Sequence, residues 1–100
     1  EYFCIWNMAC SSILSTPAFI NFAERNGFIS DFGNIQTSAE IAYRFITNNV
    51  DFIEEHTGLE DVDIERQIFL KIINSGLKYD DSISYNCWRK VQQYRKALNQ

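Results

Sequence analysis

No linker rich in proline or glycine, internal repeat or low-complexity tract interrupts this sequence. One proline and four glycines are spread over 100 residues, of which 46% are hydrophobic. A chain of this length and composition can bury a modest hydrophobic core. We therefore expect one domain over residues 1–100, built mainly from helices.

The sequence also lacks any apolar run long enough for a membrane span, and any signal-peptide pattern. Its cysteines, Cys4, Cys10 and Cys87, are odd in number and show no disulfide-framework spacing. Free, buried thiols in a reducing compartment are the expected state. A zinc site that combines them with His56 stays open on ligand type, although the C-x2-C spacing of strong zinc motifs is missing. Together these absences predict a soluble, cytoplasmic protein without membrane contact.

Positive charge is in the minority, and the net charge is −4. A protein with a negative net charge does not bind nucleic acid through its overall charge. The charge is uneven, because residues 84–100 carry Arg89, Lys90, Arg95 and Lys96 and no acidic residue. This basic segment can contact either a phosphate backbone or the acidic remainder of the chain.

Cap and turn residues divide the first half of the chain into short elements. Residues 2–6 are apolar throughout and rich in strand formers, which is typical of a central strand. Asn7 is a suitable N-cap for a helix to about Leu14. The pair Thr16-Pro17 opens a helix to about Asn26, with Gly27 as its terminator. Around Asp31-Phe32-Gly33 we expect a small hairpin or a tight loop.

The second half contains three predicted helices. Thr37 and Glu40 form the T-x-x-E pattern of a capping box, which opens a helix to about Asn48. Residues 51–55 are expected to form a short helical turn, and the last helix covers residues 85–98. The longest helix covers residues 58–75, ends at Gly76, and is expected to bury Leu59, Val62, Ile68, Phe69, Ile72 and Ile73.

The most informative segment is His56-Thr57-Gly58-Leu59-Glu60-Asp61. Thr57 and Glu60 repeat the T-x-x-E pattern, so Thr57 is the expected N-cap of the long helix. His56 then lies in the preceding loop, and Asp61 projects from the first turn, near the positive end of the helix dipole. The spacing suits a proton acceptor beside a metal-binding carboxylate. In the plainer interpretation, Asp61 only complements the dipole and His56 is an ordinary loop residue.

Three segments around this motif together resemble the C-terminal half of DEDDh-type 3′–5′ exonucleases, the proofreading-exonuclease family. They are NIQTSAE at residues 34–40, YRFIT at residues 43–47 and DFIEEHTGLED at residues 51–61. The last motif of that family is a histidine followed five positions later by an aspartate, and Gly58 stands where the family often has alanine. The resemblance spans roughly residues 1–75. It implies an α/β, ribonuclease-H-like fold for the complete enzyme, of which this chain forms a mainly α part with one short strand and a small hairpin.

The resemblance also implies roles for the two site residues. His56 is the general base that takes a proton from the attacking water, and Asp61 binds one of two divalent metals, Mg²⁺ or Mn²⁺. The implied substrates are nucleic-acid 3′ ends, with DNA favoured over RNA. The family also needs an Asp-x-Glu on a first strand and a further aspartate, and the strand predicted here carries no Asp-x-Glu. Because the sequence starts at Glu1 and leads directly into an apolar run, we expect a C-terminal portion of an exonuclease domain that is inactive alone.

Other residues near the motif have two interpretations each. Asp63 and Glu65 are extra acids that we expect to complement the helix dipole rather than to touch a metal. Tyr43 and Phe52 can stack on bases, but packing in the core is favoured for both. Arg44 is a candidate for a phosphate contact.

Two other functions stay open. The first is a small helical protein-interaction module without catalysis. Its eight Phe, five Tyr and two Trp form an aromatic surface that docks a partner or a second copy of the chain. The second is a small DNA-binding protein that uses the basic last helix, against which the acidic total argues. An exonuclease needs His56 and Asp61 to converge in an open cleft, whereas a binding module can bury His56 or turn it away.

Overall fold

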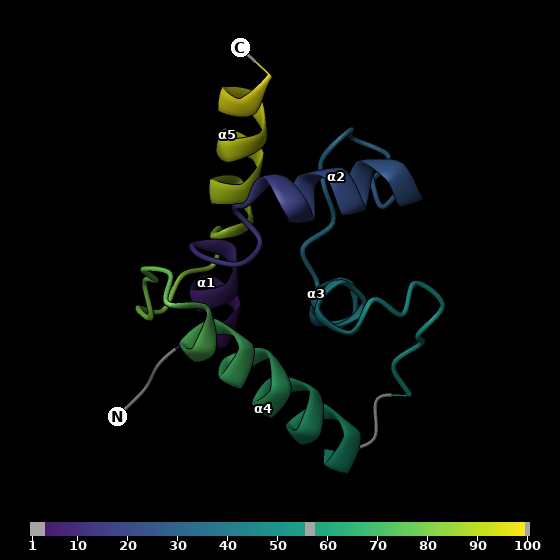
Figure 1. Cartoon of the computed structure of the whole chain (residues 1–100), viewed down its shortest axis with the longest axis vertical. Coiled ribbons are helices and arrows are strands. Elements are labelled where there is room, and N and C mark those ends of the chain that lie inside the picture. The colour runs from purple at the N-terminus through teal and green to yellow at the C-terminus, as the bar shows by residue number, and fades with distance from the viewer. Residues whose placement is uncertain (1–3, 56–57, 100) are drawn as a thin grey trace.

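The computed structural model describes residues 4–55 and 58–99, and five helices make up most of this part of the chain (Figure 1). They are α1 (Ile5–Cys10), α2 (Pro17–Asn26), α3 (Ala39–Thr47), α4 (Gly58–Ser75) and α5 (Trp88–Leu98). Within the described ranges, the β structure is limited to one antiparallel bridge between Ile29 and Ile35. The prediction of a mainly helical chain with a small hairpin is confirmed.

The short helix α1 lies at the centre of the arrangement. It packs against both α4 and α5, and α3 packs against α4 (Figure 1). The helix α2 joins this group through aromatic rings: the centroid of Phe45 on α3 lies 5.1 Å from Phe19 and 5.4 Å from Phe22. The core is therefore one continuous cluster to which all five helices contribute. In the part of the chain described, none of the helices combines the length and the apolar character needed to cross a membrane.

The sequence signals at both ends of α2 are confirmed. The hydroxyl of Thr16 accepts a hydrogen bond from the Phe19 amide at 3.2 Å, and Pro17 occupies the first turn. Gly27 ends the helix with a φ of 72°, a left-handed conformation that glycine adopts without the steric cost of a Cβ atom.

The strand predicted over residues 2–6 is wrong where the structure describes it. Ile5 and Trp6 are helical, and Cys4 is the N-cap of α1, with its sulfur accepting from the Asn7 amide at 3.4 Å. Residues 2 and 3 lie outside the described residues. A short apolar run fits a buried strand and a buried helix equally well. Met8, Ala9 and Cys10, which follow the run, are helical and buried, so the segment forms a helix rather than a strand. Irregular turns follow from residue 11 to Leu14.

Asn7 is a buried member of α1 rather than its N-cap. Its side chain is 0% exposed, and its amide nitrogen donates to the carbonyl oxygen of Ser82 at 2.9 Å. Its amide oxygen accepts from Lys90 Nζ at 2.7 Å, and the same ammonium group lies 3.2 Å from Asp80 Oδ2. Hydrogen bonds from Ser82, and then from Lys90, hold the pKa of Asp80 below its ordinary value. This network, here called the Asn7 network, joins α1 to the 80–82 loop and to α5.

A hairpin between α2 and α3 is fastened to α5. The Ser30 amide donates to the Asn34 carbonyl at 2.8 Å, which closes the turn around Phe32. The side chain of Gln92 on α5 both accepts from the Ile35 amide and donates to the Ile35 carbonyl, each at 2.9 Å. An extended backbone segment is thereby paired by a side chain instead of by another strand.

The N-cap of α3 lies one residue later in the sequence than predicted. Ser38, rather than Thr37, is the N-cap, and its hydroxyl accepts from the Ile41 amide at 3.3 Å. Thr37 is drawn inward because its carbonyl accepts from the Trp6 indole nitrogen at 2.9 Å. Asn48 ends the helix with a φ of 54°. The helical turn predicted over residues 51–55 is wrong, since a turn at residues 50–51 leads into irregular backbone.

The bounds predicted for α4 are confirmed, but its predicted buried face is partly wrong. Ile64, Ile68 and Ile72 form the buried stripe of the helix. Of the six side chains predicted to be buried, Ile68 and Ile72 are buried and Phe69 is half-buried, whereas Leu59, Val62 and Ile73 are exposed. The helix carries two apolar stripes on opposite sides, and spacing alone does not say which one meets the core.

The helix α5 begins at Trp88, three residues later than predicted, and Tyr85 is 90% exposed. Val91 is its fully buried residue, and Arg95 pairs with Glu24 on α2 at 2.8 Å. Together with the Lys90–Asp80 pair, this contact shows that part of the basic segment binds acidic groups of the same chain. The intramolecular interpretation of that segment is therefore confirmed for two of its four cations.

The cysteines are free thiols, as predicted. Cys10 and Cys87 are buried and Cys4 is half-buried. Burial is the main reason why the pKa of Cys10 and that of Cys87 lie above the ordinary value, so both stay protonated. No cluster of three potential ligands suited to a metal ion occurs among residues 4–55 and 58–99. The described residues therefore offer no zinc site, and His56 lies outside them.

We predict that Asn7→Ala lowers the free energy of unfolding by about 2 kcal/mol, because it removes the hydrogen bonds that a fully buried amide makes to the Ser82 carbonyl and to the ammonium group of Lys90. The measurement is urea unfolding followed by circular dichroism. Asn74→Ala is the control: this exposed asparagine on α4 has no hydrogen bond in the described structure, and a change within about 0.5 kcal/mol is expected. Equal losses in both variants contradict the role of the Asn7 network.

Candidate functional site

The predicted site lies at the start of α4. The helix begins at Gly58, so Asp61 projects from its first turn as the sequence predicted. His56 and the predicted cap Thr57 lie outside the described residues. The convergence of His56 with Asp61 therefore stays a prediction, and the described side of the site consists of Asp61 and of the segment that leads to His56.

Asp61 has an unusual environment for a carboxylate. The residue is half-buried, and its Oδ1 atom is buried without a hydrogen-bond partner among the described residues. Asp61 precedes Ile64 by three positions and Ile68 by seven, so it continues the buried stripe of α4 toward the helix N-terminus. A buried carboxylate oxygen without a donor is costly, and such groups in folded proteins call for an explanation. This oxygen can accept a hydrogen bond or bind a cation.

The segment that approaches His56 is fastened to both neighbouring helices. The carbonyl of Phe52 accepts from Arg44 Nε at 2.8 Å, and the amide of Glu54 donates to Glu40 Oε2 at 2.8 Å. The amide of Glu55 donates to Glu60 Oε1 on α4. Residues 52–55 therefore have a fixed path despite their irregular backbone.

Arg44 is occupied by these structural contacts. Its guanidinium pairs with Glu40 Oε1 at 3.2 Å and lies 5.2 Å from the ring centroid of Phe28. The rings of Tyr43 and Phe52 are half-buried, with centroids 4.6 Å apart. This geometry favours the packing interpretation of both aromatic residues, and it uses the donors of Arg44 that a phosphate contact requires.

The two further acids of α4 differ in their surroundings. Asp63 accepts from Arg66 at 3.0 Å and from Gln67 at 2.7 Å, and these bonds hold its pKa below the ordinary value. Its carboxylate is thus engaged on the helix surface. Glu65 has no hydrogen bond or ion pair in the described structure, and it lies at the rim of a cavity.

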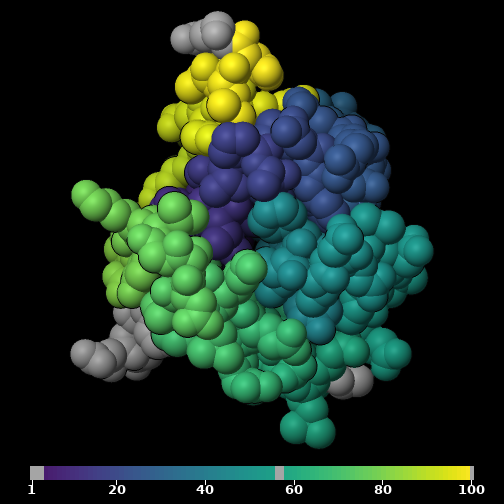
Figure 2. All heavy atoms as spheres, viewed as in Figure 1, coloured from purple at the N-terminus to yellow at the C-terminus, as the bar shows by residue number. Residues whose placement is uncertain are grey.

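This cavity is a feature that the sequence analysis missed. It lies where α1, α3 and α4 meet, and Figure 2 shows the molecule hollowed there. Its volume is about 230 Å³. Its walls combine residues from three segments that lie more than twenty positions apart in the sequence, and the hydrogen bond from Trp6 to Thr37 joins two of them. No local pattern in the sequence signals such a cavity.

Comparisons with protein-family models, with curated proteins and with solved structures find no match to this chain. The resemblance to DEDDh exonucleases therefore depends on the residues of the sequence motif alone.

We predict that Glu40→Ala speeds amide hydrogen exchange over residues 52–55, because it removes the acceptor of the Glu54 amide and the partner of Arg44. The measurement is hydrogen–deuterium exchange read by mass spectrometry or NMR. Asp63→Ala is the matched control, since it also removes a helix carboxylate paired with an arginine but lies away from this segment. Unchanged exchange in the Glu40 variant contradicts the anchoring role.

Proposed function

We propose that this chain is the C-terminal portion of a DEDDh-type 3′–5′ exonuclease domain, with an α/β, ribonuclease-H-like fold in the complete enzyme. Its substrates are nucleic-acid 3′ ends, with DNA favoured over RNA. His56 serves as the general base, and Asp61 serves as a ligand of Mg²⁺ or Mn²⁺. The remaining acidic ligands come from residues outside this sequence.

The observation that carries this proposal is the state of Asp61. Its carboxylate lies one turn into α4, five positions after the single histidine, and its Oδ1 atom has no donor. A position in the first turn of a helix accommodates negative charge, because the dipole and the free amides stabilise it. A carboxylate oxygen that has no partner among the described residues can serve as a ligand of a hard divalent cation.

The chemistry assigned to each residue follows from its type. An imidazole has an unperturbed pKa near neutrality, so His56 can take a proton from water at physiological pH and release it afterwards. Bound divalent metals stabilise the attacking and leaving oxygens of a phosphodiester displacement. The anchors at Phe52 and Glu54 hold the segment before His56 in one place, which a general base requires because it acts only within hydrogen-bond reach.

The test is nucleotide release from 3′-labelled DNA by the full-length protein in which this sequence occurs, with Mg²⁺ or Mn²⁺ present. We predict that His56→Ala lowers turnover by about 100-fold or more while DNA binding changes far less. Asp61→Asn is expected to abolish metal-dependent turnover. The matched control is Asp63→Asn, two positions away on the same helix, which should retain activity within about twofold because Asp63 already pairs with Arg66.

Two outcomes overturn the proposal. One is the absence of any metal-dependent release of nucleotides by the full-length protein. The other is an equal loss of activity in the Asp61 and Asp63 variants, which indicates a general effect of charge on α4. Equal losses of turnover and of DNA binding in the His56 variant contradict its role as the base.

A second candidate is the helical interaction module without catalysis, and one observation favours it. The outer stripe of α4, which we define as Leu59, Val62, Leu70 and Ile73, faces away from the core. Leu59 is 89% exposed and Val62 is 64% exposed. The stripe is interrupted by Arg66, and exposed apolar residues on one face of a helix are typical of a surface that another polypeptide covers. In the exonuclease the remainder of the enzyme covers it; in the interaction module a second copy of the chain does.

The interaction-module candidate predicts that the isolated chain self-associates through the outer stripe. Val62→Glu should abolish this self-association, because a buried unpaired charge is costly at an interface. The measurement is sedimentation velocity over a range of concentrations. The matched control is Ile83→Glu, which adds the same charge at an exposed apolar residue outside α4. A chain that is monomeric throughout, or a dimer that both variants weaken equally, contradicts the self-association of this module.

A further inference from the structure

We propose that the cavity between α1, α3 and α4 binds a small organic cation, an alkylamine or arylamine, whose apolar body fills the cavity and whose ammonium group pairs with Glu65. This inference does not depend on the proposed exonuclease function. It concerns other residues and another ligand, and the two can fail separately.

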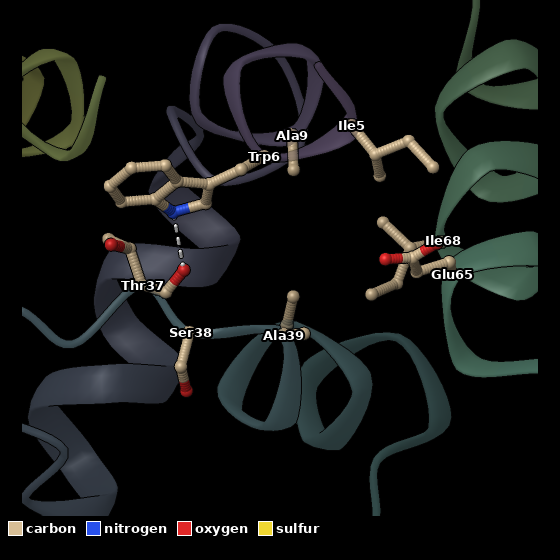
Figure 3. A pocket seen from close by; sticks show the side chains of 9 residues that line it. Ile5, Trp6, Ala9, Thr37, Ser38, Ala39, Glu65 and Ile68 are labelled. Carbon is tan, nitrogen blue, oxygen red and sulfur yellow. Dashed lines mark hydrogen bonds between the residues drawn. The ribbon is translucent and has the colours of Figure 1, made fainter. Parts of the chain in front are cut away.

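The cavity has mainly apolar walls, with side chains arriving from three directions (Figure 3). Small side chains on α1 and α3 leave the space open, and Ile68 on α4 closes one side. The lining residues are Ile5, Trp6, Ala9, Thr37, Ser38, Ala39, Ala42, Glu65 and Ile68. A cavity of about 150 Å³ is sufficient for benzene. A cavity of about 230 Å³ therefore has room for a ring that carries a short amine arm.

The polar groups of the lining are already engaged, with one exception. The indole N–H of Trp6 donates to the Thr37 carbonyl, and the hydroxyl of Ser38 accepts from the Ile41 amide. Glu65 is the only lining residue with a charge, and Figure 3 shows its side chain reaching from α4 toward the hollow, across from Trp6. A ligand that enters meets apolar walls and one carboxylate, which disfavours anions and favours a cation.

Among residues 4–55 and 58–99, no cationic side chain forms an ion pair with Glu65. Arg66, its neighbour on α4, is paired with Asp63, and Arg44 on α3 is paired with Glu40. The ion pairs of the described structure leave Glu65 out. A cationic ligand supplies the missing partner, and the Trp6 indole across the cavity offers an apolar wall for the body of the ligand.

The test uses phenethylamine as the probe and the fluorescence of Trp6 as the signal. The second tryptophan is removed by Trp88→Phe, so that quenching reports on the cavity. We expect saturable binding of phenethylamine at neutral pH. 2-Phenylethanol, which is neutral and of similar shape, should bind at least about tenfold more weakly because it does not pair with a carboxylate.

Three variants on the same background assign the contacts. Glu65→Gln should reduce the affinity for the amine to that for the alcohol, and Ala39→Phe should remove the binding of both by filling the space. Asp63→Asn is the matched control and should bind the amine as the parent does. Glu65 and Ala39 are both exposed, so these substitutions leave the core intact, and circular dichroism checks the fold.

Equal affinity for the amine and the alcohol overturns the inference, because the cavity then has no preference for a cation. Unchanged binding in Glu65→Gln, or an equal loss in Asp63→Asn, overturns it as well. Asp61→Asn separates the two proposals: it should abolish the nuclease activity of the full-length protein and leave the binding of phenethylamine unchanged.

Discussion

The buried amide of Asn7 is the interaction on which the rest of the structure depends. The helix α1 has only six residues, and a helix of this length is unstable without tertiary contacts. Asn7 fixes it, because Ser82 and Lys90 satisfy both ends of an amide that has no access to water. The position of α1 in turn determines where Trp6 forms a wall of the cavity and which face of α4 meets the core.

The helix α4 carries the central residue of each proposal, Asp61 for the metal site and Glu65 for the cavity. One side of it packs on α1 and α3 through Ile64, Ile68 and Ile72, and Asp61 continues this stripe to the first turn. Glu65 lies between this stripe and the outer one, at the rim of the cavity. Two carboxylates four positions apart therefore have different surroundings. One has a buried oxygen without a donor, and the other reaches over an apolar hollow.

Local signals in the sequence predicted those elements whose ends are set by their own residues. Thr16, Pro17 and Gly27 were sufficient for α2, and Gly76 marked the end of α4. The sequence predictions were wrong where residues far apart in the sequence determine the local structure. The hydrogen-bond partners of Asn7 lie 75 and 83 positions away, so its burial within a helix is not visible in its neighbours. The buried face of α4 was ambiguous because either apolar stripe fits a helix. The same holds for the site: the motif located Asp61, but the cavity depends on contacts between three helices.

The segment of residues 52–55 shows how irregular backbone can still be held in place. Its carbonyl at Phe52 and its amide at Glu54 are bound by Arg44 and Glu40, which also pair with each other on α3. Bonds to charged groups are stronger than those between neutral groups, so a few of them replace the hydrogen bonds of a helix or strand. Because Glu60 on α4 binds the Glu55 amide, the path toward His56 is tied to the helix that carries Asp61. The segment that ends at Glu55 and the first turn of α4 are therefore held together by a direct contact rather than by the covalent chain alone.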